Sequence, residues 1–184
     1  MRIAGGIAKG RRLAPPAIQG ARPTSELIRG VIFNSLGPEI LANAKVADLY
    51  AGIGSLGIES LSRGAAFADF VEKDPRQCAV LRRNLKATGL EDRAKVHRRE
   101  TLKALTLLKG PYGVVLMDPP YRIESLDQDL EAIDKSEIIE NEGMLIVGHS
   151  KRLSLKEEYG KLSRVRTRRH GDSVVDFFIR RGAQ

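Results

Sequence analysis

The feature that most constrains the fold is a regular alternation of strand-like and helix-like segments between residues 45 and 150. Short apolar runs predict strands at 45–50, 67–72, 94–98, 113–117 and 143–150. Helical periodicity and capping residues predict helices at 55–64, 74–89, 101–108 and 125–139. In the second of these, Asp74 is the expected cap, Pro75 the first helical residue and Gly89 the residue after the last turn. Alternation of this kind is typical of an α/β protein whose mostly parallel sheet carries helices on both faces.

The pattern changes on both sides of this central region. Residues 162–169 and 173–181 predict two strands separated only by His170-Gly171-Asp172, which makes a C-terminal antiparallel hairpin. Upstream, a helix is expected to begin at Thr24 or Ser25, either of which can cap it, and to end at Gly37-Pro38. Residues 1–22 are basic and glycine-rich, so we expect an arm or small hairpin there and one domain over 23–184.

Composition excludes several classes of protein. No apolar run approaches the ~20 residues of a membrane span, and the N-terminal residues lack the apolar core of a signal peptide, which favours the cytoplasm. Cys78 is the only cysteine, so no disulfide framework or zinc cluster is expected, and we expect it to be buried. His97, His149 and His170 are scattered, which favours structural roles and no metal site.

Positive charge gathers near both ends of the chain. The net charge is +8, and the cations before Ser25, with no acid among them, are Arg2, Lys9, Arg11, Arg12 and Arg22. A second set comprises Lys161, Arg164, Arg166, Arg168 and Arg169. Such clusters indicate a nucleic-acid backbone as partner. Arg164, Arg166 and Arg168 alternate, so we expect them to share one strand face, where they either bind RNA or protect a sheet edge.

A glycine-rich loop follows the first strand of the alternating region. Gly52, Gly54 and Gly57 form G-x-G-x-x-G between a strand and a helix, where backbone N–H groups are open to a ligand. Glu72 ends the next strand, twenty residues after Gly52, and can accept from both hydroxyls of a ribose. These features fit a nicotinamide dinucleotide and S-adenosylmethionine equally well.

The segment Asp118-Pro119-Pro120-Tyr121 favours methyl transfer. It follows a buried strand, and the prolines stiffen the backbone so that the Asp118 carboxylate and the Pro119 carbonyl are two fixed acceptors. Such acceptors can bond the hydrogens of an exocyclic amine and direct its lone pair toward an electrophile. Tyr121 offers a ring on which the base can stack.

On these residues the sequence resembles the RsmD family of bacterial methyltransferases, which use S-adenosylmethionine and make N2-methylguanine in 16S ribosomal RNA. The similarity includes GGIAKGRRL, RPTSELIRGVIFNSLGP, DLYAGIGSLGIESLSRGA, FVEKD, DPPY and HSK. The first two segments are the most particular to the family. The resemblance implies a Rossmann-like methyltransferase sheet of seven strands, mostly parallel, with the last pair as the hairpin.

The resemblance also implies roles for individual residues. It places Gly52 and Gly54 at the methionine side of the cofactor and Glu72 at the ribose; the full predicted cofactor set is Asp48, Ala51, Gly52, Gly54, Glu72, Lys73, Glu100 and Thr101. The predicted catalytic set is Asp118, Pro119, Pro120 and Tyr121. The predicted RNA-binding set is Arg2, Lys9, Arg11, Arg12, Arg22, Thr24 and Arg29, of which Arg22, Thr24 and Arg29 are implied to sit near the pocket.

Three positions depart from the family pattern. Glu100-Thr101 stands where Asp-Ala is usual, Gly30 stands where a larger helix former is usual, and Gly148 replaces an acid. Glycine inside a helix costs about 1 kcal/mol of helix stability. An acid remains at residue 100, so adenine recognition can survive with a longer side chain.

We therefore predict an S-adenosylmethionine-dependent guanine-N2 methyltransferase acting on 16S rRNA, within a small ribosomal subunit or its assembly intermediate. Three alternatives stay open at this point. One is methylation of adenine N6 or another amine of nucleic acid, since the motifs do not separate these from guanine N2. The others are a small NAD-dependent oxidoreductase and a non-catalytic RNA-binding protein that kept the fold.

Overall fold

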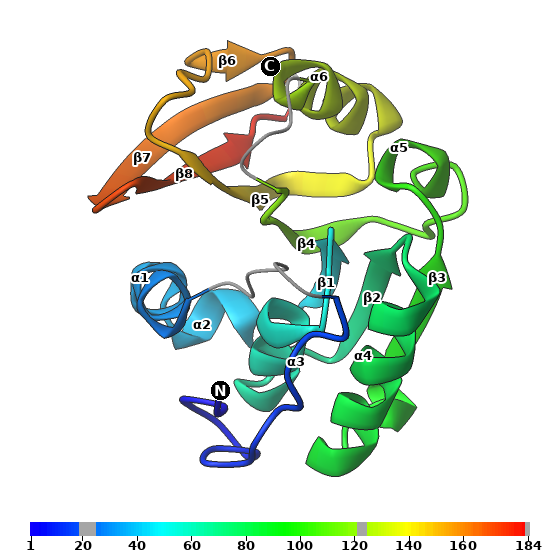
Figure 1. Ribbon diagram of the computed structural model, residues 1–184. Helices are drawn as coiled ribbons and strands as arrows, with labels where there is room; N and C mark the ends of the chain where they lie inside the picture. The colour runs from blue at the N-terminus through cyan, green and yellow to red at the C-terminus, as the bar shows by residue number, and fades with distance from the viewer. Residues whose placement is uncertain (19–24, 121–124, 183–184) are drawn as a thin grey trace.

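The computed structural model describes residues 1–18, 25–120 and 125–182, and its strands form a single sheet (Figure 1). The strands are β1 (Lys45–Leu49), β2 (Phe67–Glu72), β3 (Ala94–Arg98), β4 (Tyr112–Met117), β5 (Ile139–Ser150), β6 (Glu158–Tyr159), β7 (Leu162–His170) and β8 (Ser173–Arg180). Their spatial order is β3-β2-β1-β4-β5-β8-β7-β6. The first five are parallel, and β8, β7 and β6 are antiparallel to their neighbours. The predicted sheet with its hairpin is confirmed, and the two-residue β6 adds an eighth strand to the seven expected.

Helices cover both faces of the sheet (Figure 1). They are α1 (Glu26–Leu36), α2 (Pro38–Leu41), α3 (Ser55–Ser62), α4 (Pro75–Thr88), α5 (Thr101–Ala104) and α6 (Leu126–Ser136), with a 3₁₀ turn at Glu91–Arg93. Successive side chains of β4 are buried in two hydrophobic cores on opposite faces of the sheet. Leu116 packs with α1, α3 and α4, and Met117 packs with α5 and α6. Within the described ranges, no helix has the length and apolarity that crossing a membrane requires.

Local sequence signals set the helix starts. The Ser25 hydroxyl accepts from the Ile28 N–H at 3.2 Å and caps α1, while the other predicted cap, Thr24, lies outside the described residues. Asp74 caps α4, with Pro75 as its first residue and Gly89 in left-handed conformation after its last turn. These ends were predicted from side-chain chemistry that acts within a few residues.

Two helices are shorter than predicted. The segment 101–108 is α-helical only to Ala104, because the chain then tightens into a turn in which the Leu107 N–H donates to the Ala104 carbonyl at 2.8 Å. The segment 125–139 ends at Ser136, because Glu137 adopts a left-handed conformation with φ of 54°. Residues from Ile139 onward belong to β5 instead.

A β-bulge corrects the prediction for the arginines of β7. The pairing with β8 shifts between Arg164 and Arg166, so these two residues point to opposite faces of the sheet. Arg164 is paired with Asp176 and Glu157, whereas Arg166 donates to the Ser35 carbonyl of α1 at 2.9 Å. The expectation that Arg164 shares a face with Arg166 and Arg168 is therefore wrong.

The N-terminal arm is a hairpin that packs into the core. Arg2 and Arg12 form an antiparallel bridge, and the apolar side chains of Ile3, Ala8 and Leu13 are buried against the α1 and α3 layer. Backbone N–H groups of the arm also donate to side chains of α3 and α4. The arm is therefore part of the folded core, which its basic and glycine-rich sequence did not indicate. The proposed division at residue 22 falls outside the described residues and stays a prediction.

Two isoleucines of this arm test its contribution to stability. Ile3 is 1% exposed and Ile7 is 77% exposed. We expect Ile3→Ala to lower the free energy of unfolding by about 2–4 kcal/mol, because it leaves a cavity in the core. Ile7→Ala, the same change on an exposed side chain of the same hairpin, should change it by less than about 0.5 kcal/mol. Urea denaturation measures both, and equal effects would contradict a packed arm.

Candidate functional site: a carboxylate-lined edge of the sheet

Three glycines shape the loop between β1 and α3, but for different reasons. A Cβ on Gly54 would lie 2.0 Å from Leu81 Cδ1, and one on Gly57 would lie 2.3 Å from Phe70 Cε1, so close packing demands these two glycines. Gly52 has φ of 54°, and a Cβ added there would meet no atom of a described residue within 4 Å. Gly52 therefore borders open space, as a residue beside a ligand must.

Glu72 connects the glycine loop to the start of α4. Its Oε2 accepts from the Gly52 N–H at 2.9 Å, and its Oε1 accepts from the Asp74 N–H at 2.8 Å. A carboxylate has about four lone-pair positions, so each oxygen retains capacity for a further donor. The half-buried side chain can thus hold the loop and still accept from two hydroxyls.

Asp48 is a buried acid beneath the same loop. It is 1% exposed, and its Oδ2 accepts from the Gly57 N–H at 2.8 Å. Burial, followed by the charges of Asp118 and Glu72, raises the pKa of Asp48 to about 7, with the Gly57 bond opposing the shift. The carboxylates that follow β2 and β4 therefore act on Asp48 near the end of β1.

Asp118 follows β4, the neighbour of β1 on the side away from Glu72. Asp118 is half-buried, Pro119 is buried and Pro120 is exposed, while Tyr121 lies outside the described residues. Gly148 on β5 lies beside it, since a Cβ there would stand 2.6 Å from Asp118 Oδ1. In this chain a side chain at residue 148 would therefore displace the Asp118 carboxylate from its position.

The other predicted cofactor residues lie along the same edge of the sheet. The Ala51 N–H donates to the Val71 carbonyl at 2.9 Å, which fixes the loop against β2. Lys73 is exposed after β2, and Thr101 is buried at the start of α5. Glu100 is exposed and pairs with Lys103 at 2.6 Å, a contact that lowers the pKa of its carboxyl group. The assignment of these residues to a cofactor stays a prediction.

The predicted RNA-binding residues separate into two groups. The exposed ones are Arg2, Lys9, Arg11 and Arg12, all on the arm. Arg29 is 2% exposed, and its guanidinium donates to Glu59 at 3.2 Å and to the Arg2 carbonyl at 2.7 Å. A side chain so buried cannot offer its charge to a phosphate, so we correct its assignment from RNA contact to a link between α1 and the arm. Arg22 and Thr24 lie outside the described residues.

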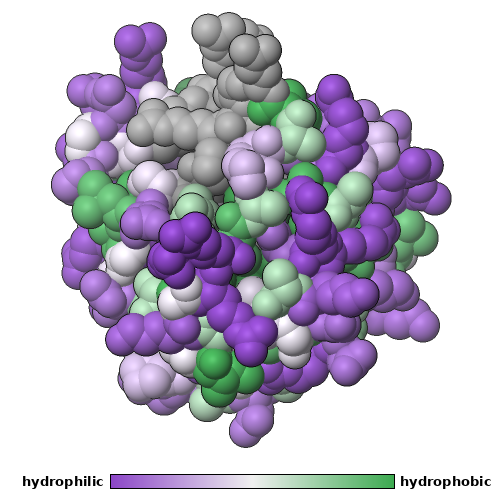
Figure 2. Space-filling model, turned by 60° about the horizontal axis from the view of Figure 1, so that its bottom comes forward, coloured by the Kyte–Doolittle hydropathy of each residue, from purple (hydrophilic) through white to green (hydrophobic). Residues whose placement is uncertain are grey.

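The turn of the arm lies far from the carboxylates. The Ile7 and Ala8 N–H groups donate to Ser62, the last residue of α3, whereas the glycine loop precedes the first residue of that helix. Eight helical residues extend about 12 Å. The face of the molecule that carries the arm is largely hydrophilic, with separate small apolar areas (Figure 2).

Sequence reasoning missed an interaction between the glycine loop and α6. Tyr50 has φ of 64°, unusual for an aromatic residue, and its hydroxyl donates to Asp129 Oδ2 at 2.6 Å. Asp129 is 1% exposed, and burial raises the pKa of both groups. No sequence signal pairs residues 79 positions apart, although Tyr50 lies within the loop motif.

The histidines and the cysteine occupy structural positions or the surface. His97 Nε2 lies 2.7 Å from Asp69 Oδ1, and His149 Nε2 lies 2.9 Å from Asp176 Oδ2. His170 is exposed at the turn of the hairpin, and Cys78 is buried, as expected. Among the described residues, no group of three or more His, Cys, Asp or Glu side chains could hold a metal ion.

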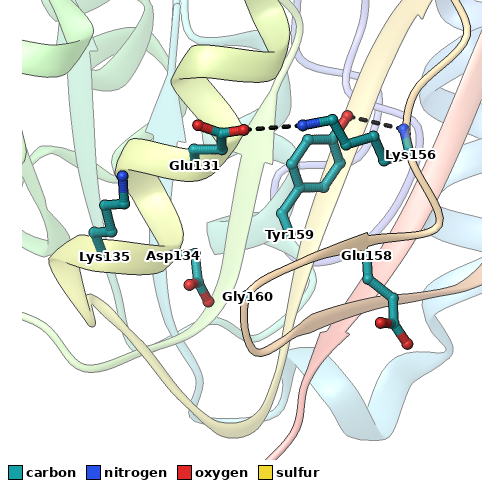
Figure 3. A pocket seen from close by; sticks show the side chains of 7 residues that line it. All are labelled: Glu131, Asp134, Lys135, Lys156, Glu158, Tyr159 and Gly160. Carbon is teal, nitrogen blue, oxygen red and sulfur yellow. Dashed lines mark hydrogen bonds and ion pairs between the residues drawn. The ribbon is translucent and has the colours of Figure 1, made fainter.

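A surface pocket lies elsewhere, between α6 and the segment around β6 (Figure 3). Two of its charged groups form an ion pair, Lys156 with Glu131 at 3.0 Å, and the Lys156 backbone N–H donates to the Tyr159 hydroxyl at 3.0 Å. It contains none of the predicted catalytic or cofactor residues, so we do not assign it to the chemistry.

Comparison with known proteins agrees with this arrangement. Ribosomal RNA small subunit methyltransferase D of Escherichia coli K12 is 34% identical over 147 residues, which cover 80% of this chain and 73% of that protein. A family model described as Conserved hypothetical protein 95 matches residues 1–179. The chain belongs to this family, the RsmD family. A second similar protein, the putative rRNA methyltransferase YlbH of Bacillus subtilis, is 34% identical over 99% of this chain and 100% of its own length.

Solved structures support the RsmD-type fold. The putative methyltransferase yhhF of Escherichia coli superimposes with a TM-score of 0.86 at 29% identity, covering 98% of each chain. A 16S rRNA N2 G1207 methyltransferase of T. thermophilus, solved with AdoMet and guanosine, has a TM-score of 0.70 at 22% identity over 90% of this chain and 45% of its own. At that identity the second likeness shows the fold alone.

Asp48 predicts a pH dependence of stability. Its folded pKa of about 7 lies above that of an unfolded aspartate, so its neutral form stabilises the fold at low pH. This contribution is complete below about pH 4 and is lost as the pH rises to 7, by at most about 4 kcal/mol. Asp48→Asn can still accept from Gly57 but cannot ionise. The difference in free energy of unfolding between variant and parent should therefore shift in favour of the variant from pH 4 to pH 7.

Urea denaturation at several pH values measures this difference. A constant difference across the range would mean that Asp48 is ionised in the folded protein at all these pH values. Glu91→Gln, a neutralisation at an exposed position in the 3₁₀ turn, serves as the control and should show little trend.

Proposed function

We propose that this protein transfers a methyl group from S-adenosylmethionine to the exocyclic N2 amine of a guanine in 16S rRNA. The observation that carries the proposal is the order of groups at one edge of the sheet. Glu72 on β2, the glycine loop after β1 and Asp118 after β4 follow one another on adjacent strands. A ribose acceptor and an amine acceptor thus flank one loop, as a methyl transfer between two ligands requires.

The residues around the loop fit S-adenosylmethionine. Open space beside Gly52 and the remaining lone pairs of Glu72 suit a ribose with two hydroxyls. The charges of Glu72 and Asp118, which both raise the pKa of Asp48, disfavour the pyrophosphate of a nicotinamide dinucleotide. When bound, S-adenosylmethionine supplies a methyl group on a positively charged sulfonium.

Asp118 and Pro119 would orient the amine of the target base. The carboxylate accepts one amine hydrogen and the Pro119 carbonyl accepts the other, which keeps the lone pair out of conjugation with the ring. Pro119 is buried and its φ is restricted by the pyrrolidine ring, so its carbonyl has little freedom to move. After transfer the amine nitrogen sheds a proton to Asp118 or to water, and no strong base is needed beforehand.

The relatives support the choice of RNA and of guanine. The name of the Escherichia coli relative gives the small-subunit ribosomal RNA as its substrate, and membership of the RsmD family favours the N2 amine of guanine. We extend both to this chain, with the small ribosomal subunit or its assembly intermediate as partner and the cytoplasm as location. Methylation of adenine N6 is the competing outcome.

Transfer of labelled methyl groups tests the proposal directly. Small subunits and protein-free 16S rRNA, both lacking the modification, are incubated with the protein and labelled S-adenosylmethionine. Mapping of the labelled base should find N2-methylguanine at a single position. Label in adenine would refute the guanine assignment, and absence of label in both substrates would refute the proposed function.

Asp118 variants test the role of the acceptor. We expect Asp118→Ala to bind S-adenosylmethionine as the parent does and to lose about 10²–10³ in single-turnover rate, as when one donor of an oxyanion hole is removed. Asp118→Asn should retain intermediate activity, because its amide oxygen can accept one bond from the amine. Full activity in Asp118→Ala would contradict the assignment.

Gly148→Ala provides a second probe of the same carboxylate. The added Cβ would stand 2.6 Å from Asp118 Oδ1, so the carboxylate must move although its chemistry is unchanged. We expect a reduced rate with unaltered cofactor affinity. Gly30→Ala is the matched control, since a Cβ there meets nothing within 4 Å, and it should be slightly stabilising.

Glu72→Gln tests the ribose assignment. The amide keeps one acceptor but presents a donor group to the backbone N–H groups of Gly52 and Asp74 and to the ribose. We expect cofactor binding to weaken by about 1–3 kcal/mol. Calorimetry measures the affinity, with Glu91→Gln as the control. Unchanged affinity would mean that other groups hold the ribose.

A further inference from the structure

We propose that the tip of the β7–β8 hairpin is an RNA-backbone contact next to the target base, an inference that rests on the proposed function. The surface consists of Arg168 and Arg169 near the end of β7 with Lys151 and Arg152 just after β5, and we call it the hairpin-tip patch. Its occupant is the phosphate backbone of the RNA around the methylated base.

Strand register brings the hairpin-tip patch to the reaction edge. Met117 pairs with Val147, so Asp118 follows at the level of Gly148; Gly148 pairs with Val175, and Val175 pairs with Arg168. Neighbouring strands are about 4.8 Å apart, so Arg168 lies about 15 Å from Asp118 along one row of the sheet. Residues in one row point to the same face. Arg168 therefore leaves the sheet on the face toward which Asp118 points, whereas Arg169 lies on the other face, so the two arginines flank the hairpin tip.

The bulge in β7 determines which arginines of this strand belong to the hairpin-tip patch. Arg164 is turned to the other face and is held by Asp176 and Glu157. Arg166 donates to the Ser35 carbonyl, and its guanidinium lies 6.0 Å from the centre of the Phe177 ring. These two arginines therefore make contacts within the protein and are not assigned to the hairpin-tip patch. Arg168 and Arg169 are exposed beyond them.

The local charge balance favours a phosphate partner. Asp172 is the only acid from Leu162 to Ser173, and it pairs with Lys151 at 2.6 Å. The Lys151 N–H also donates to the Asp172 carbonyl at 2.9 Å, which joins the end of β5 to the hairpin turn. Arg152, Arg168 and Arg169 are thus exposed cations next to a turn that is held in place by Lys151 and Asp172. Cations of this kind can bind a phosphate backbone.

The position of the arm strengthens this inference. The turn of the arm lies at the end of α3 that is remote from the glycine loop, whereas the hairpin-tip patch lies at the edge that carries Asp118. In Figure 1 the β7–β8 tip lies at the left and the N-terminal arm at the bottom, and α1 is drawn between them. An RNA whose base reaches Asp118 meets the hairpin-tip patch before it meets the turn of the arm.

Edge protection is the competing explanation. The two-residue β6 covers only the start of β7, and charged side chains on an open edge prevent pairing with another chain. Such a role predicts association of the variants into larger species and no effect on RNA affinity. RNA contact predicts weaker RNA binding by the variants and no association into larger species. One set of variants therefore separates the two explanations.

The experiment compares two double variants with equal loss of charge. Arg168→Gln/Arg169→Gln removes cations of the hairpin-tip patch. Lys109→Gln/Arg181→Gln removes exposed cations before β4 and after β8. These two residues lie at the end of the strands opposite to Asp118. Binding of a protein-free 16S rRNA transcript is measured from low to high KCl concentration. Calorimetry with S-adenosylmethionine and size-exclusion chromatography verify that each variant is folded and monitor its assembly.

We expect the slope of log affinity against log salt to fall by about 1.5 in the hairpin-tip variant, from two lost phosphate contacts, and by far less in the control. In methyl transfer, KM for RNA should rise while kcat at saturating RNA is retained. An unchanged slope, equal changes in both variants, or association of the hairpin-tip variant without loss of affinity overturns the hairpin-tip contact. If the parent binds and methylates RNA in these cases, the proposed function survives. If the parent neither binds nor methylates RNA, both proposals fail.

Discussion

The rest of the structure depends on the hydrogen bonds and ion pairs made by the fully buried carboxylate of Glu59. It accepts from the Ala4 and Gly5 N–H groups at 2.9 and 2.8 Å, and it pairs with Arg29 at 3.2 Å and Arg63 at 2.7 Å. Arm, α1 and α3 therefore meet at one charge. Loss of one partner from a buried ion pair is strongly destabilising. Since α3 begins directly after the glycine loop, this cluster also determines where that loop lies.

Opposite electrostatic needs are met in different parts of the molecule. The protein has a net charge of +8, yet the edge of the sheet that we assign to the reaction gathers the acids Asp48, Glu72 and Asp118. Exposed cations on the arm and at the hairpin tip attract a phosphate backbone over long range. The acids within disfavour phosphate there and favour a cation. Under the proposed function, this separation would let an RNA approach the surface while only a base enters the site.

The sequence predicted the features that depend on residues close together in the chain. Strand alternation, the caps Ser25 and Asp74 and the placement of Asp118 at a strand end all follow from local chemistry. The burial of Arg29 was missed, because its partner Glu59 is 30 residues away and no motif announces the pair. The bulge at β7 was missed because one extra residue reverses a strand's faces without leaving a signal in an alternating pattern.

The position of β8 has a consequence for biosynthesis. It is the last strand of the chain, yet it lies inside the sheet between β5 and β7, and its central residues are buried. A nascent chain therefore exposes the apolar edge of β5 until residues 173–180 have left the ribosome. Pairing this late and this distant slows folding and leaves a period open to aggregation.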